Sequence, residues 1–279
     1  MLERLRWPAR LLLCFHAVDE TWPDPSLSVP PERFSSFLDE LRRAGYRGTT
    51  FSAAIAAPRG ERVVAITFDD AYTSVRRVAA PLLDSVGWPA TVFVPTQPML
   101  EGSWMEWLGS DIYAEHPVAT AQLTPDDLRA LVAQGWEVGS HGRTHRLLSR
   151  LDDRELEEEL SRSREELAGI AGACTSVSYP WGEVDSRVVE AARRVGYTSG
   201  SGLAGSYTWD DPLRTPRALI AGSDDRRRFA LKASRPLWAV RSTPLWDLAE
   251  AARGLKGARD EDSTSLLQRG VRRLKALSR

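Results

Sequence analysis

Two adjacent carboxylates, Asp69 and Asp70, directly follow an apolar stretch of the chain, VVAITF at residues 63–68. Two like charges side by side repel each other, and neither gives up its water readily unless an opposite charge compensates it. A metal ion would supply that charge, and the carboxyl ends of parallel strands are where α/β proteins gather their active sites. Alternatively, one aspartate caps the following helix and the other is solvated. The motif alone leaves both interpretations open.

Two histidines, His141 and His145, stand four residues apart in SHGRTH, directly after the apolar stretch WEVGS. Side chains at i and i+4 lie on one face of a helical turn, and this spacing allows both imidazoles to hold one metal ion. The alternative is two unrelated polar histidines in a loop, because an HxxxH pattern by itself is weak evidence. The chain has only four histidines, so a pair at a strand end favours the metal site.

Together these residues make the ligand set of a catalytic metal. Two histidines and one aspartate leave a coordination position open, which is the pattern of catalytic rather than structural zinc sites. Zinc held in this way lowers the pKa of a water to about 7 and polarises a carbonyl group. The second aspartate is then free to act as a general base. The two neighbouring carboxylates therefore have separate tasks: one holds the metal and the other takes the proton.

Short apolar runs alternate with amphipathic helical stretches, which predicts an α/β fold with a mainly parallel sheet or barrel. The predicted strands are Leu11–Phe15, Val63–Phe68, Ala90–Val94, Glu137–Ser140, Ser176–Tyr179, Thr198–Gly200 and a late one near Ala218–Ile220. The predicted helices are Pro31–Gly45, Thr73–Val86, Pro125–Gln134, Asp152–Ile170 and Asp185–Val195. They rest on apolar residues at helical spacing and on capping signals. Both chemistry-bearing motifs follow predicted strands, so we expect them at the carboxyl edge of the sheet.

The composition is that of an ordinary globular protein, with 279 residues of which 42% are hydrophobic and 27% charged. Lys and Arg number 37 against 38 Asp and Glu, so the basic excess typical of nucleic-acid-binding proteins is absent and we expect no nucleic-acid partner. The cysteines, Cys14 and Cys174, lie in runs of apolar or small residues and are interpreted as buried thiols, with a disulfide left open.

The N-terminal segment MLERLRWPARLLLCFHAV places basic residues before an apolar run, as a signal peptide does. The run is short, a histidine interrupts it and no small-x-small cleavage site follows, so a buried first strand at Leu11–Phe15 is the better interpretation. No segment is long enough to span a bilayer. We therefore expect a cytoplasmic location.

The order of the motifs TFDD, SHxxTH and SYPWG resembles that of the polysaccharide deacetylase family, a carbohydrate esterase type also called the NodB-homology family. The resemblance covers roughly Leu11–Leu231, and CFHAV, FxxFLDELRRAGY, PLLDSVGWPATVFV and LRTPRALI support it. Members of this family are distorted (β/α)7 barrels with a divalent metal, usually zinc, that remove N-acetyl and sometimes O-acetyl groups from sugars. The resemblance implies this fold and this chemistry here.

The family roles carry over to matching positions of this chain. Asp69 corresponds to the general base, and Asp70, His141 and His145 correspond to the ligands of the divalent metal, with Zn²⁺ the expected ion.

A third motif is expected to line the substrate groove. The segment Tyr179-Pro180-Trp181-Gly182 corresponds to the motif that lines one wall of the substrate groove. The backbone N–H of Trp181 is expected to donate to the oxyanion of the tetrahedral intermediate.

The chain departs from the family pattern at three points. Ala71 follows TFDD where the family usually has glycine, which is tolerable unless the backbone there needs a positive φ. Ser178 stands where the third motif usually begins with an arginine that braces the catalytic aspartate, so Asp69 must be oriented otherwise or less firmly. The late Leu-x-His that provides the general acid is absent, because no histidine follows His145.

His16 is the candidate for the missing acid. It ends the first predicted strand, and a subset of the family carries a tyrosine– or phenylalanine–histidine pair at this point, as Phe15-His16 does here. The first and last strands of a barrel are neighbours, so an acid from the first strand can replace one from the last. The alternative is a structural histidine at a strand end. We favour the acid role.

Tryptophans offer faces for sugar rings. Trp22, Trp104, Trp107 and Trp209 lie in loop-like stretches, and the insert Leu100–Glu115 is a candidate rim of the substrate groove. Ordinary packing is the alternative for each of them.

The tail differs from the body of the chain. We expect a catalytic domain over residues 1–241 and a helical, partly basic tail over 242–279. Within the tail, Ser265–Arg279 spaces apolar residues among basic ones. This pattern fits a solvated helix packed on the body, or a helix that docks on a membrane surface or a partner. Peripheral membrane association through this segment is therefore one of our hypotheses.

The sequence predicts a metal-dependent hydrolase that removes an N-acetyl group from an amino sugar or glycan, with a lipid- or nucleotide-linked saccharide as one candidate substrate. Two alternatives stay open: a catalytically silent sugar-binding homologue, and a hydrolase of a non-sugar amide. The complete Asp-Asp-His-His set argues against the silent protein. Fold alone does not separate the two kinds of amide.

Overall fold

The structure is a computed structural model that describes residues 7–22, 26–103, 105–203 and 210–234. The predicted tail at 242–279, with its basic segment Ser265–Arg279, lies outside the described residues, as do Trp104 and Trp209. The domain boundary and the membrane hypothesis therefore stay predictions. In the described part of the chain, no helix combines the length and the apolar character that crossing a membrane requires.

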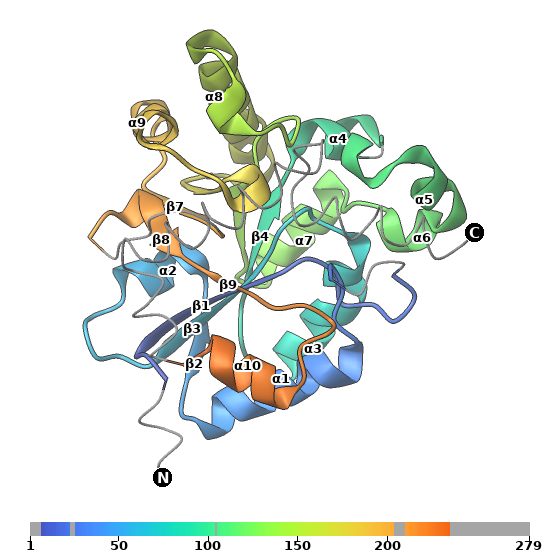
Figure 1. The fold of residues 1–279 in the computed structure, drawn as a ribbon, viewed down its shortest axis with the longest axis vertical. Coiled ribbons are helices and arrows are strands. Elements are labelled where there is room, and N and C mark those ends of the chain that lie inside the picture. The colour runs from blue at the N-terminus through green and yellow to red at the C-terminus, as the bar shows by residue number, and fades with distance from the viewer. Residues whose placement is uncertain (1–6, 23–25, 104, 204–209, 235–279) are drawn as a thin grey trace, which may run out of the picture.

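A parallel sheet forms the centre of the molecule and curls into a nearly closed barrel (Figure 1). The strand order is β8-β7-β6-β5-β4-β3-β1-β9, with β2 beside β3, and the named strands all pair in parallel. The strands are β1 (Arg10–Phe15), β2 (Arg47–Thr49), β3 (Val63–Phe68), β4 (Thr91–Val94), β5 (Glu137–Ser140), β6 (Ser176–Ser178), β7 (Ser199–Gly202), β8 (Thr215–Pro216) and β9 (Ala218–Leu219). The predicted distorted (β/α)7 barrel is confirmed.

One short segment joins the two ends of the sheet. β8 pairs with β7, whereas β9 pairs with β1, and only Arg217 separates the two strands in sequence. The chain thus crosses at this residue from the last strand of the sheet to the first. This crossing confirms that the first and last strands of the barrel are neighbours.

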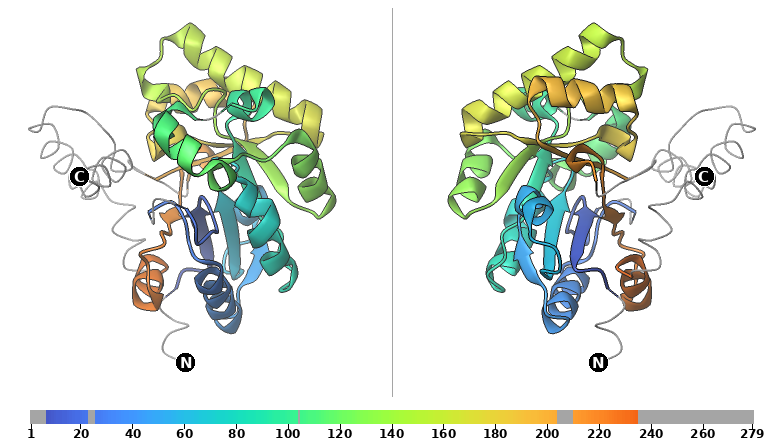
Figure 2. Two further views of the ribbon diagram at one scale, coloured as in Figure 1. Left: turned by 90° about the vertical axis from the view of Figure 1, so that its right-hand side faces the viewer. Right: turned by 90° about the vertical axis from the view of Figure 1, so that its left-hand side faces the viewer.

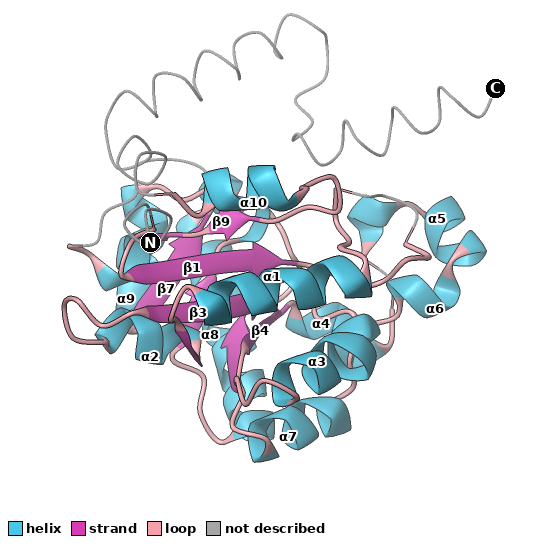
Figure 3. Cartoon of the chain, turned by 90° about the horizontal axis from the view of Figure 1, so that it is seen from below, coloured by secondary structure: helices cyan, strands magenta, loops and turns pink. Residues whose placement is uncertain are grey.

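Helices surround the strands (Figure 3), with α8 and α9 toward one end of the molecule and α1 and α10 toward the other (Figures 1 and 2). They are α1 (Pro31–Arg43), α2 (Phe51–Ala56), α3 (Ala80–Asp84), α4 (Thr96–Glu101), α5 (Ser110–Glu115), α6 (Pro117–Thr120), α7 (Pro125–Ala133), α8 (Asp153–Ala171), α9 (Ser186–Val195) and α10 (Arg226–Lys232). An apolar core lies between the sheet and these helices.

Local signals explain the clearest helix, α8. Asp152 accepts from the backbone N–H of Glu155 and the Glu155 side chain accepts from that of Asp152, which makes a reciprocal capping box. Leu156 and Leu160 face the core, and Gly172 ends the helix with a φ of 83° that glycine adopts without strain. These features agree with the predicted bounds to within a residue or two.

The predicted single helix Thr73–Val86 is wrong in detail. The structure has a π-helical turn at Val75–Ala79, followed by the short helix α3. Pro81 lies in the first turn of α3 and has no N–H to donate, so a regular α-helix cannot continue through this point. Strands β2 and β8 have three and two residues. Such short runs carry no readable period.

Both cysteines are buried and free, so Cys14 and Cys174 form no disulfide. The interpretation of each as a buried thiol is confirmed.

Candidate metal centre and catalytic site

Three predicted ligands converge at the carboxyl ends of the strands. Asp70 follows β3, and His141 and His145 belong to the loop that follows β5. The Oδ1 atom of Asp70 lies 3.2 Å from Nε2 of His145 and 3.5 Å from Nε2 of His141. One donor atom from each residue lies within 4.8 Å of the other two, and all three side chains are buried. Three ligand atoms therefore face a common point.

The hydrogen bonds around these side chains leave the facing atoms free. Nδ1 of His141 lies 2.7 Å from the carbonyl oxygen of Ser178, and the Tyr72 hydroxyl donates to Oδ2 of Asp70 at 3.3 Å. Oδ1 of Asp70 is buried and has no hydrogen-bond partner. A buried carboxylate oxygen with no hydrogen-bond partner is unfavourable. Opposite two imidazole nitrogens, the same oxygen is well placed to bind a divalent cation. The residues present therefore fit such an ion.

Electrostatics favour the ligand form of His141. Burial lowers the pKa of this imidazole to about 4, despite the opposing attraction of Asp69 and Asp70. His141 is thus neutral at pH 7, and the bond from Nδ1 to the Ser178 carbonyl places the lone pair on Nε2.

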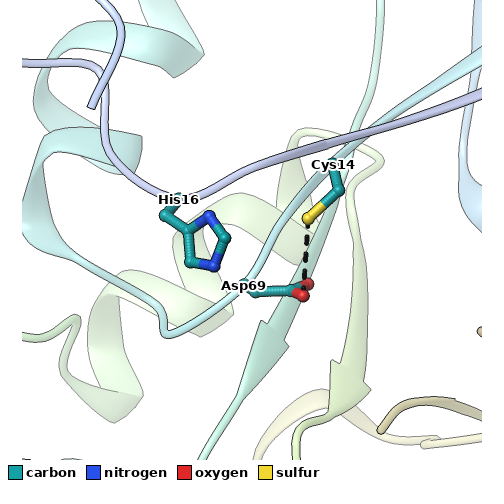
Figure 4. Close-up of side chains that lie close together, drawn as sticks. All are labelled: Cys14, His16 and Asp69. Atoms are coloured by element: carbon teal, nitrogen blue, oxygen red, sulfur yellow. Dashed lines mark hydrogen bonds between the residues drawn. The ribbon is translucent and has the colours of Figure 1, made fainter. Parts of the chain in front are cut away.

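Asp69 does not share this ligand position and is held by a different set of donors. Arg217 donates from Nη1 to Oδ1 at 2.8 Å and from Nη2 to Oδ2 at 2.7 Å. The Ser178 hydroxyl donates to Oδ2 at 3.0 Å, and the Cys14 thiol lies 3.5 Å from the same oxygen (Figure 4). A bidentate arginine–carboxylate pair fixes both the position and the plane of the carboxylate. Asp69 is therefore rigidly oriented.

The charge state of Asp69 follows from this pairing. Burial is the largest single influence and would raise the pKa of the carboxyl. The attraction and hydrogen bonds of Arg217, together with the attraction of His141 and His16, outweigh burial and hold the pKa well below its usual range. Asp69 is ionised at neutral pH.

An arginine that braces Asp69 is thus present, but it comes from position 217, between β8 and β9. Ser178 occupies the place where the family usually has arginine, and its hydroxyl accepts from Nη2 of Arg217 at 2.6 Å while donating to Asp69. With Ser178 in place of the usual arginine, Asp69 was expected to be oriented by another group or to be held less firmly. The structure shows the first of these, because Arg217 holds the carboxylate by two hydrogen bonds. Sequence reasoning did not assign a role to Arg217. The available signal was that Arg217, the second arginine of LRTPRALI, stands directly before three apolar residues.

Unusual backbone angles also gather at this site. Among the described residues, the non-glycine residues with positive φ are Asp70 (69°), Ala71 (56°), His145 (60°) and Trp181 (66°). Alanine in place of the usual glycine was expected to be tolerable at position 71 unless the backbone there needs a positive φ. The backbone of Ala71 does have a positive φ, so this residue is strained. An L-residue pays about 1–2 kcal/mol in this region, and such strain persists where the surrounding structure over-determines it, commonly at functional sites.

His16 lies beside the same carboxylate. It follows β1, is buried, and lines a small pocket together with the metal ligands and Asp69. Figure 4 shows its ring next to Asp69. Its Nδ1 atom has no hydrogen-bond partner. The remaining lining residues of the pocket are Trp107, Trp181, Gly182 and Leu203.

The third motif divides between the core and the pocket. Trp181 lines the pocket, and its indole N–H donates to the carbonyl oxygen of His145 at 3.1 Å. Tyr179 is buried in the core and its hydroxyl donates to the carbonyl oxygen of Leu213 at 2.9 Å. Pro180 is also buried. Of the predicted groove segment, Trp181 and Gly182 therefore line the pocket, whereas Tyr179 and Pro180 do not.

A larger groove of about 890 Å³ adjoins the pocket and shares Trp107, His145 and Trp181 with it. Its walls come from α4, the segment after it, and residues 144–151. The insert Leu100–Glu115 lines this groove through Glu101, Ser103, Met105 and Trp107, and its role as a rim for substrate stays a prediction. By contrast, Trp22 is buried and packs on Tyr72 at a ring distance of 4.3 Å.

Residues 56–200 match the family model for polysaccharide deacetylase, which is more than half of the chain. The chain belongs to the polysaccharide deacetylase family. It is 27% identical over 200 residues to the protein YxkH of Bacillus subtilis (strain 168), an alignment that covers 69% of this chain and 64% of that protein. It is 25% identical over 276 residues to poly-beta-1,6-N-acetyl-D-glucosamine N-deacetylase of Escherichia coli (strain K12), covering 82% of this chain. The chain thus spans less than two thirds of either relative, and only 39% of the second.

Solved structures of this polysaccharide deacetylase fold support the architecture. The Streptococcus pyogenes deacetylase PplD, determined in complex with acetate, has a TM-score of 0.66 and 21% identity, covering 81% of this chain and 99% of its own. IcaB from Ammonifex degensii has a TM-score of 0.65 and 24% identity, covering 80% and 96%. At such identities the likeness establishes the fold alone.

Proposed function

We propose that this polysaccharide deacetylase family member is a metal-dependent hydrolase that removes N-acetyl groups from an amino sugar or glycan. One observation carries the proposal: the ionised, arginine-braced carboxylate of Asp69 stands beside a separate set of three buried metal-ligand atoms in one pocket. A water between them would meet both a proton acceptor and a Lewis acid. The family relationship supports the same reading.

The residues divide the work as follows. A divalent ion held by Asp70, His141 and His145, with zinc the expected ion, would polarise the acetyl carbonyl and acidify a water at that point. Asp69 accepts the proton of this water as its oxygen bonds to the carbonyl carbon. Arg217 keeps the accepting carboxylate in one orientation throughout.

The remaining steps need two further groups. The backbone N–H of Trp181 donates to the oxyanion that forms on the carbonyl oxygen. His16, as the imidazolium, protonates the sugar nitrogen as the carbon–nitrogen bond breaks. The carbon–nitrogen bond breaks to give acetic acid and the amine, and the proton of the acid passes to the amine, so the products are acetate and the protonated amino sugar. Transfer of the proton from Asp69 to His16 through solvent then restores both groups. His16 lies near Asp69 in a pocket too small to hold many waters, which suits direct transfer.

The groove indicates where the rest of a saccharide would lie. It extends the pocket past Trp107, whose ring offers an apolar face suited to the C–H face of a sugar. The Escherichia coli relative is named for a polymer of N-acetylglucosamine, which supports an N-acetylated hexosamine as the reacting unit. A lipid- or nucleotide-linked saccharide fits the same groove.

Acetate release from a panel of N-acetylated saccharides tests the proposal. Wild type, Asp69→Asn and the chelator-treated protein are compared, with zinc added back to the last. We expect release that the chelator abolishes and zinc restores. Asp69→Asn should bind zinc but lose turnover by a factor of about 10²–10⁴, since it keeps the shape of the base without its charge.

Two other results would replace the proposal. Zinc binding with saccharide binding but no acetate release identifies a silent sugar-binding homologue. Zinc binding with release only from amides that carry no sugar identifies the second alternative, a hydrolase of a non-sugar amide.

A further inference from the structure

A carboxylate on the neighbouring helix holds the loop that carries both histidine ligands. We call residues 141–145 the histidine loop. Glu159 of α8 accepts with Oε2 from the backbone N–H groups of Arg143 at 2.8 Å and Thr144 at 2.9 Å. Its other oxygen, Oε1, accepts from the Thr144 hydroxyl at 2.5 Å. Both carboxylate oxygens are therefore used, and all three donors lie between the two histidines.

The opposite side of the histidine loop is held as well. The carbonyl oxygen of Gly142 accepts from the N–H of Thr96 at 3.3 Å, and that of Arg143 accepts from the N–H of Gln97 at 2.8 Å. Both donors belong to the first turn of α4. The loop thus presents its N–H groups to α8 and its carbonyl groups to α4.

The burial of Glu159 shows how much it depends on these contacts. Its side chain is only 5% exposed, and among the described residues no cation forms an ion pair with it. A buried carboxylate without hydrogen bonds is strongly unfavourable, so the donors of the histidine loop supply its compensation. The approach is also close, because a Cβ on Gly142 would lie 3.3 Å from Oε2.

The imidazole ring of His145 lacks the hydrogen bond on Nδ1 that His141 has. Nδ1 of His141 has the Ser178 carbonyl as a partner, whereas Nδ1 of His145 is buried with none. His145 also has a φ of 60°, a strained angle that only surrounding contacts can maintain. Metal ligands usually owe their orientation to a hydrogen bond on the second ring nitrogen. For His145 that task falls to contacts of the backbone: the indole N–H of Trp181 donates to its carbonyl oxygen, and Glu159 accepts from the N–H groups of the two residues before it.

We propose that Glu159 is a positioning residue of the metal centre, which sets the histidine loop so that His145 meets Asp70 and His141 at one point. This inference rests on the proposed function, because it assumes that the three ligands hold a metal ion. Glu159 touches neither the ion nor the substrate, and it acts through the amide groups of Arg143 and Thr144.

Zinc affinity, measured by competition with a chromophoric chelator, tests the proposal without any substrate. Glu159→Ala leaves two N–H groups and one hydroxyl without their acceptor, and we expect its affinity to fall about 10–100-fold. Glu159→Gln should regain most of this loss, because its amide oxygen still accepts from both N–H groups. If Glu159→Ala does not fold, Thr144→Val removes the hydroxyl donor alone and should lower the affinity several-fold.

Glu166→Ala is the matched control. Glu166 lies on the same helix and contacts the side chain of Arg143, with Nε to Oε1 at 3.3 Å, but not the loop backbone. It should keep the affinity of the wild type. The melting temperature with and without zinc gives a second readout, since a purely structural role lowers both values equally and leaves the zinc-induced increase unchanged.

The outcomes separate the positioning role of Glu159 from the existence of the metal centre. Equal zinc affinity in Glu159→Ala and wild type overturns the positioning role and leaves the proposed function intact. A wild type that binds neither zinc nor cobalt overturns the metal centre itself, and the positioning role with it.

Discussion

Arg217 binds both carboxylate oxygens of Asp69 from the one position that separates the two strands closing the barrel. The two residues lie 148 positions apart in the chain. Arg217 is wholly buried, and it also donates to Thr67 and Ser178, which belong to two further strands. The closure of the barrel and the orientation of the Asp69 carboxylate therefore depend on the same side chain.

Arg217→Met tests the electrostatic part of this relationship. The variant leaves Asp69 buried without its cation, and the removal of one partner of a buried pair costs about 3–5 kcal/mol of folding stability. In the wild type the pKa of Asp69 lies below its ordinary 3.8, so its stabilising contribution is complete at neutral pH and is lost as the pH falls below about 4. In the variant burial dominates and raises that pKa.

The folded variant then holds a proton that the unfolded chain has released, so its stability falls as the pH rises. We expect the deficit relative to wild type, from urea unfolding of the zinc-free protein, to be larger at pH 8 than at pH 5. Arg193→Met, which removes an exposed pair with Glu190 and Asp211, is the control and should change little. A deficit of the same size at both pH values would contradict the pairing.

A swap of positions tests whether the brace can come from the usual family site. Arg217→Ser should lower kcat about 100-fold through misorientation of Asp69. The double variant Arg217→Ser/Ser178→Arg should recover about tenfold of this loss, because position 178 already contacts Oδ2 of Asp69 and the guanidinium of Arg217 vacates the adjoining space. A double variant no more active than Arg217→Ser would show that an arginine orients Asp69 only from position 217.

His16→Gln tests the general acid. We expect kcat/KM for an N-acetyl substrate to fall about 10²–10⁴-fold, because the amine leaves poorly without a proton. An O-acetyl ester with an acidic leaving group should lose far less, and zinc content should stay unchanged. His116→Gln, at a histidine that does not line the pocket, serves as the control. Equal losses on amide and ester would assign His16 a structural role.

The two thiols offer a test of burial. Burial raises the pKa of Cys14 well above its usual value and that of Cys174 to about 12, so neither is a thiolate at pH 8. We expect no reaction of the folded protein with an aromatic disulfide reagent at pH 8, and two reactive thiols per chain in denaturant. A thiol that reacts rapidly in the folded protein would contradict the burial of Cys14 in β1 or of Cys174 just before β6.

Much of the architecture could be read from local patterns. The bounds of β3 and β5 agree with their predicted ranges, and α8 agrees because its capping box and apolar stripe are written within one segment. The meeting of Asp70, His141 and His145 was also predictable, since polar residues at the carboxyl ends of parallel strands share one edge of the sheet, even though β4 lies between β3 and β5 here. Signals of this kind need only neighbours within about one helical turn or one strand.

The sequence by itself determined the α/β class, because short apolar runs alternate with helical ones, and the order of its motifs placed the chain in a family of distorted (β/α)7 barrels. The candidate ligand types and the pair of aspartates each lie in a short run with its own spacing. Tertiary structure alone decided that Arg217 braces Asp69, that Tyr179 lies in the core while Trp181 faces the pocket, and that Glu159 binds the histidine loop. The physical reason is that a buried charge accepts whichever partner the closed barrel brings within about 3 Å. Hydrogen bonds of this kind join residues far apart in the chain, and no local pattern specifies them.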